Sequence, residues 1–90
     1  MAITKEEAVR KARTDLVSRI GVKEDEIEQS VEEDDFPDMA LGAATKGEMS
    51  GQMMTSGWRI NLKARGQNFE YRASKNQIRL FNYKGSNYRI

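Results

Sequence analysis

Basic side chains recur at alternate positions in the second half of the chain, interleaved with apolar and aromatic residues. Side chains of a β-strand point to its two faces in turn, so we expect these basic residues to share the outer face of a sheet. Such a face can follow a phosphate backbone and stack bases, whereas the plainer interpretation is a solvated surface with cation–π pairs. The candidate residues are Arg59, Lys63, Arg65, Arg72, Arg79, Phe81 and Tyr83.

Methionines form a second candidate group, since four of the five in the chain lie between Met39 and Met54. Flexible methionine side chains adapt to irregular apolar partners, which makes exposed clusters suitable for binding. The candidate residues for a protein or peptide partner are Met39, Met49, Met53 and Met54. The alternative, which we favour for these three residues, is that Phe36, Met39 and Leu41 tuck under the sheet as anchors while the tip of the loop is disordered.

Acidic residues cluster at Glu32–Asp35 and Asp38. Their spacing is not that of a calcium-binding EF-hand loop, and a solvated strand edge is the preferred interpretation. The glycine-containing stretch 42–51 lacks the G-K-[ST] ending of a phosphate-binding loop.

The composition argues against most enzyme chemistry. The chain has no cysteine and no histidine, which excludes Ser–His–Asp and Cys–His catalysis, disulfides and thiolate metal sites. We therefore expect no catalytic residue, no metal and no cofactor. The opening MAITKEEAVRKA is not a secretory signal, so we expect a cytoplasmic protein without membrane association, although an exported form that has lost its leader would look the same.

Charge is distributed unevenly along the chain. Residues 1–45 carry 6 basic and 12 acidic side chains, a balance of −6, and residues 46–90 carry 9 basic and 2 acidic, a balance of +7. Either the basic half contacts nucleic acid, or the two halves are neighbours in the fold and neutralise each other. We favour the second explanation.

The first element that must position these residues is an amphipathic helix. Thr4 and Glu7 form a T-x-x-E capping box, and Gly21 is placed to end the helix. Apolar residues between them recur every three or four positions, as on one face of a helix. They are Val9, Ala12, Leu16 and Ile20.

Strands joined by short turns follow the helix. We expect a short edge strand at 27–33, a hairpin over 57–74 that turns at Arg65-Gly66-Gln67, and a further strand at 78–83. Residues 84–87 should form a turn, and Tyr88–Ile90 a tail that pairs or frays. The segment at about 35–56 is predicted to be a long irregular loop.

The sequence therefore predicts a single α+β domain over residues 1–90, with one N-terminal helix packed on an antiparallel meander sheet of three to four strands. The helix should bury its apolar face against six residues of the sheet, namely Trp58, Ile60, Leu62, Phe69, Tyr71 and Leu80.

Two resemblances meet at these segments. The opening I-T-K-E-E-A-V-R-K-A and the later G-W-R-I-N-L-K-A-R-G-Q-N-F-E-Y-R-A-S resemble the PepSY domain. That resemblance implies a helix over an antiparallel sheet and a role in binding or regulating peptidases, mostly outside the cytoplasm.

The chain is also similar to a group of small bacterial proteins, through A-R-T-D-L-V-S-R-I-G-V, I-E-Q-S-V-E-E, F-P-D-M-A-L-G-A, S-G-W-R-I-N-L and F-E-Y-R. Ala43 stands where that group usually has cysteine, and Phe36 where it has tryptophan. This resemblance implies a fold and no established activity.

The functional prediction is a non-enzymatic interaction module for an unknown protein or peptide, with a nucleic-acid-associated protein as the alternative. We expect a monomer or a weak homodimer.

Overall fold

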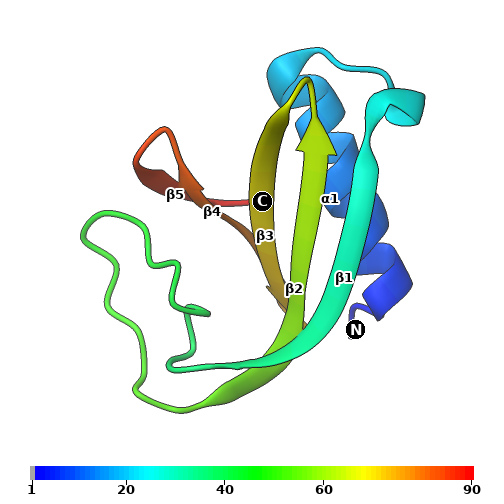
Figure 1. Cartoon of the computed structure of the whole chain (residues 1–90). Helices are drawn as coiled ribbons and strands as arrows, with labels where there is room; N and C mark the ends of the chain where they lie inside the picture. Colours follow the sequence, from blue (N-terminus) through cyan, green and yellow to red (C-terminus); the bar gives the residue numbers. More distant parts are fainter. Residues whose placement is uncertain (1) are drawn as a thin grey trace.

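One helix packed on an antiparallel sheet makes up the fold in the computed structural model, which describes residues 2–90 (Figure 1). The helix α1 spans Lys5–Ile20, and the Glu7 N–H donates to Thr4 Oγ1 at 3.1 Å, as the capping-box pattern predicts. Gly21 ends the helix with φ of 71°, and its N–H donates to the Val17 carbonyl. No helix within residues 2–90 is long and apolar enough to cross a membrane.

The sheet is a meander in which every strand pairs with its neighbours in the sequence. Its strands, in spatial order, are β1 (Glu28–Phe36), β2 (Thr55–Ala64), β3 (Gln67–Ser74), β4 (Gln77–Tyr83) and β5 (Ser86–Arg89). A short 3₁₀ turn, Glu24–Glu26, connects α1 to β1. In Figure 1, α1 lies behind β1–β3, and the β1–β2 loop (residues 37–54) lies on the other side of the sheet.

The hairpin predicted around Gly66 is confirmed. Arg65 and Gly66 have φ of 53° and 73°, and Ala64 pairs with Gln67 across the turn. Positive φ at both central residues is the geometry of a two-residue turn whose twist matches that of the strands. Trp58, Ile60 and Leu62 thereby face the helix together.

The prediction of three to four strands was wrong, because the sheet has five. The chain reverses at Lys84 and Gly85, with φ of 52° and 85°, so residues predicted as turn and tail form β5 and pair with β4. At the other edge, β1 continues beyond the predicted 27–33 because its carboxylates find partners on β2. Asp34 pairs with Arg59 at 2.6 Å, and Asp35 accepts from Ser56 Oγ at 2.8 Å.

The core lies between α1 and the sheet, as the apolar pattern predicts. Leu16, Ile60, Leu62 and Leu80 are completely buried. Trp58 is half-buried at the margin of the same cluster. Each large apolar side chain buried there contributes about 1.5–3 kcal/mol, so this layer supplies most of the stability.

One polar link crosses the helix–sheet interface. The Tyr71 hydroxyl donates to Asp15 at 2.7 Å, and Arg19 holds the same carboxylate at 3.0 Å. Burial and the bond to Asp15 raise the pKa of Tyr71 well above its usual value, so this hydroxyl stays protonated. The link fixes the position of α1 along the sheet.

Shortening a core side chain should destabilise the protein strongly. Leu16→Ala and Ile60→Ala each remove a fully buried side chain and leave a cavity, so each should lower the free energy of unfolding by about 2–5 kcal/mol. Urea or guanidinium denaturation measures the loss. Lys11→Ala, on the exposed face of α1, is the control and should change stability by less than about 0.5 kcal/mol. A core variant as stable as the control would contradict this packing.

Candidate functional site: a methionine groove and a covered arginine row

Three arginines stand side by side across the outer face of the sheet. Arg59 on β2 pairs in register with Arg72 on β3, and Arg72 pairs with Arg79 on β4. We call these three residues the arginine row. Like charges directly opposite each other on neighbouring strands destabilise a sheet, so the row requires compensating groups.

Carboxylates and rings of the sheet supply part of that compensation. Glu70 reaches both Arg59 and Arg72, at 3.5 and 2.6 Å, and Asp34 holds Arg59 from β1. The Arg72 guanidinium lies 3.7 Å from the centre of the Phe81 ring, a cation–π contact. The Asp34–Arg59 pair joins the acidic and basic halves of the sequence, in line with the favoured explanation of the uneven charge.

The β1–β2 loop provides the remaining partners. The carbonyl oxygens of Leu41 and Ala43 accept hydrogen bonds from Arg72 and Arg79, at 3.0 and 3.3 Å. Glu48 binds Arg79 through both carboxylate oxygens, with 2.7 Å between Oε2 and Nη2. Only 3% of Arg79 is exposed, so the loop covers this end of the row.

Local contacts give residues 38–42 of the loop, next to the arginine row, a defined shape. Asp38 Oδ1 accepts from the N–H groups of Ala40 and Gly42, at 2.9 and 3.0 Å. Leu41 is fully buried with φ of 60°, a conformation that is costly for leucine and is maintained by the surrounding contacts. Gly42 also has positive φ, and a Cβ there would lie 2.7 Å from Arg72 Nη1, so a larger residue would be strained and would displace the Arg72 guanidinium.

A second turn of the loop positions Glu48, a residue that was not among the sequence candidates. The Glu48 N–H donates to the Thr45 carbonyl, and the Thr45 N–H donates back to Glu48 Oε1 at 2.9 Å. The side-chain hydrogen bond from Arg79, followed by that from the Thr45 backbone, lowers the pKa of Glu48 to about 2. The T-x-x-E spacing at 45–48 equals that of the capping box at 4–7, and this pattern is the sequence signal that indicates the turn.

The predicted basic face is therefore divided. Arg79 is buried, Arg59, Arg72 and Phe81 are half-buried, and Lys63 is exposed. Tyr83 lies on the opposite face, where it packs against Phe69 with 6.1 Å between ring centres. A register shift between Leu80 and Tyr83, with φ of 51° at Asn82, reverses the alternation that placed Tyr83 beside Phe81.

Three of the four predicted methionines meet in one groove. Met39, Met53 and Met54 are 49%, 65% and 70% exposed, and they line a groove of about 960 Å³ beside the half-buried Trp58. We call it the methionine groove. Met49 is 96% exposed and lies outside it. Of the three residues predicted as anchors, Phe36 and Leu41 are buried as expected, whereas Met39 is half exposed.

The methionine groove has an acidic side. Glu33, Asp34 and Asp35 at the end of β1 line it, and Lys75 is its one basic lining residue. The Met39 N–H donates to the Gly51 carbonyl at 3.0 Å, which joins the two ends of the loop next to the groove. The arrangement combines adaptable apolar side chains with carboxylates, as suits a segment that carries both apolar and basic residues.

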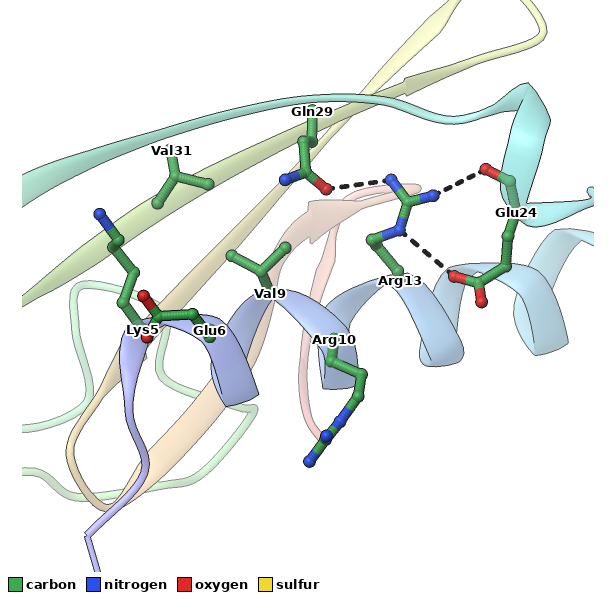
Figure 2. A pocket seen from close by; sticks show the side chains of 8 residues that line it. All are labelled: Lys5, Glu6, Val9, Arg10, Arg13, Glu24, Gln29 and Val31. Carbon is green, nitrogen blue, oxygen red and sulfur yellow. Dashed lines mark hydrogen bonds and ion pairs between the residues drawn. The ribbon is translucent and has the colours of Figure 1, made fainter.

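A smaller groove lies between α1 and β1 (Figure 2). Val9 and Val31 form its apolar floor, and its volume is about 550 Å³. Arg13 closes one end by donating to Gln29 Oε1 at 3.0 Å and to Glu24, as the dashed lines in Figure 2 show. We call it the α1–β1 groove.

Within residues 2–90, no group of three or more acidic side chains is arranged to hold a metal ion. One family model matches the chain, over residues 9–81, and it describes a domain of unknown function, DUF8738. The chain belongs to this family. The DUF8738 match runs from α1 to β4, so it includes the arginine row and the whole β1–β2 loop. No curated protein and no solved structure matches the chain.

Stability should depend on pH through Glu48. Its pKa is lower in the folded protein than in the unfolded chain, so its contribution is complete above about pH 4.5 and is lost as the pH falls through about 2. Glu48→Gln should therefore be less stable than the parent at about pH 6, and the difference should shrink toward about pH 3. Urea denaturation of both proteins between about pH 6 and about pH 3 measures this difference in the free energy of unfolding.

The control for Glu48→Gln is Glu32→Gln, which removes an exposed carboxylate that makes no ion pair within the described residues. Its stability should follow the parent at each pH. A constant difference between Glu48→Gln and the parent from about pH 6 to about pH 3 would contradict the assigned role of Glu48.

Proposed function

We propose that this protein is a non-enzymatic interaction module that binds a protein or peptide at the methionine groove. The observation that carries the proposal is the exposure of Met39, Met53 and Met54 together, next to Trp58, in a single hollow. Apolar side chains that gather on a surface, rather than occurring singly, mark sites of association. Methionine adds adaptability, because its unbranched side chain can repack against different partners.

The lining charges define the partner's chemistry. Glu33 and Asp35 are exposed, and only Asp34 of the three carboxylates in the groove is held by an arginine within the described residues. A partner segment with apolar residues flanked by lysine or arginine would complement both features. A peptidase or its substrate is one partner class in agreement with the PepSY resemblance, and we include peptidase regulation in the proposal.

The nucleic-acid alternative receives less support from this arrangement. Lys63 and Arg65 of the predicted basic face are exposed, but Glu48, Glu70 and Asp34 already bind the guanidinium groups of the arginine row. The loop also covers Arg79, so a phosphate would have to displace Glu48. Nothing in the geometry favours this second function over the first.

Replacing the groove methionines should abolish partner capture. We expect an affinity-tagged protein to retain a protein partner from native cell extract at about 0.5 M salt, where exposed ion pairs are largely screened. The double variant Met53→Gln/Met54→Gln should lose that partner, because a polar amide replaces each exposed thioether. Mass spectrometry of the retained proteins is the measurement.

Met49→Gln is the matched control, since Met49 is more exposed than the groove methionines but lies outside the groove. It should retain the same proteins as the parent. Identical capture by the parent, the double variant and the control would contradict binding at the groove. Retention that disappears at high salt and reappears on a polyanion column would favour the nucleic-acid alternative.

A further inference from the structure

The strand β1 leaves one of its edges without a backbone partner. It is an outer strand of the sheet and pairs on one side with β2. Two bonds show which groups point away from β2. The Asp35 N–H donates to the Asp34 side chain, and the Ile27 carbonyl accepts from Arg13.

In an antiparallel strand, the N–H and C=O groups of one residue point to one side and those of the next residue to the other side. The bonds at Ile27 and Asp35 therefore place the outward N–H and C=O groups on the odd-numbered residues of β1. Within the described residues, no outward backbone hydrogen bond is made by Gln29, Val31 or Glu33. An extended segment can pair with such an edge through its main chain.

The α1–β1 groove and the methionine groove lie at the two ends of this free edge of β1. Gln29 and Val31 line the α1–β1 groove, and Glu33 and Asp35 line the methionine groove. Figure 2 shows Val31 of β1 above Val9 of α1, with the hollow open beside them. A strand laid along the edge would run from one groove to the other.

The negative charge of β1 indicates which kind of segment can pair with its free edge. Five of the residues in β1 are acidic and none is basic, namely Glu28, Glu32, Glu33, Asp34 and Asp35. Pairing with β1 of a second copy would oppose carboxylate to carboxylate, which is unfavourable. A basic segment would instead neutralise them.

We propose that β1 binds a basic, extended segment of a partner protein as an additional strand. This inference rests on the proposed function and specifies its binding mode. Partner residues opposite Val31 point toward α1 and enter the α1–β1 groove, where an apolar side chain fits over Val9. Partner residues opposite Glu32 and Asp34 lie on the outer face, where lysine or arginine meets a carboxylate. The segment that fits best therefore alternates apolar and basic residues.

The probe is a capped synthetic peptide of about eight residues in which valine and lysine alternate, long enough to span the β1 edge. Its matched control replaces each lysine by glutamate. Fluorescence anisotropy at low salt should show binding of the lysine peptide and not of the glutamate peptide. In the complex, hydrogen exchange followed by NMR should slow at the amides of Val31 and Glu33, whose N–H groups point outward.

Two variants at position 33 isolate the contribution of the backbone N–H to peptide binding. Glu33→Ala and Glu33→Pro both lose the carboxylate, but only proline also removes the outward N–H. Proline is tolerated on an edge strand when its nitrogen faces solvent, so the ladder to β2 stays intact. We expect Glu33→Pro to bind the lysine peptide about tenfold more weakly than Glu33→Ala, because it loses a main-chain hydrogen bond and obstructs the incoming strand.

Several results would overturn strand addition. They are equal binding of the two peptides, unchanged exchange at Val31 and Glu33 in the complex, or equal affinity of the two Glu33 variants. The exchange measurement uses the unmodified protein, so it decides the question even if Glu33→Pro does not fold. Loss of partner capture in Met53→Gln/Met54→Gln together with any of these results would leave the proposed function standing and reject only the strand-addition mode.

Discussion

The outer face of the sheet depends on the neutralisation of three adjacent arginines. Arg59, Arg72 and Arg79 oppose one another across three strands, and a sheet does not tolerate such a row without partners. The sheet provides Glu70 and Asp34, and the β1–β2 loop provides Glu48 and two backbone carbonyls. The loop is thus held by these polar contacts together with the buried Ala40, Leu41 and Ala43. On the opposite face, α1 is held by apolar burial and by the Tyr71–Asp15 bond.

The β1–β2 loop covers the arginines but leaves its methionines exposed. The loop turns its carbonyls and Glu48 toward the arginines, while Met39, Met53 and Met54 remain in the hollow at the end of β1. Buried and half-buried basic groups are thereby occupied within the protein. The methionine groove and the β1 edge stay open and combine apolar with acidic residues, and this is why we propose them as the surfaces that bind a partner.

Local patterns in the sequence were sufficient for the helix and the central hairpin. Thr4 and Glu7 mark where α1 begins, Gly21 marks where it ends, and Gly66 marks the turn between β2 and β3. Each of these signals acts within a few residues, so tertiary contacts did not alter them. The apolar alternation from Trp58 to Ala73 likewise identified the face that packs on α1, because a one-residue slip would expose it.

The features that escaped prediction depend on less regular backbone or on distant partners. The bulge at Asn82 needs a positive φ at a residue other than glycine, and it moved Tyr83 to the helix side. The same backbone conformation at Lys84 allowed β5 to form. The order of the loop rests on pairs such as Glu48 with Arg79, which lie far apart in the sequence. Periodicity carries no information about such pairs.

The meander has a consequence for how the chain reaches its fold. Strands β2 to β5 are joined by two-residue turns, so their pairing closes only short loops and should be fast. Pairing of β1 with β2 must first close residues 37–54, which costs more chain entropy. We therefore expect the acidic strand to join the sheet late, and its charges should keep it hydrated while the newly made chain is most prone to aggregate.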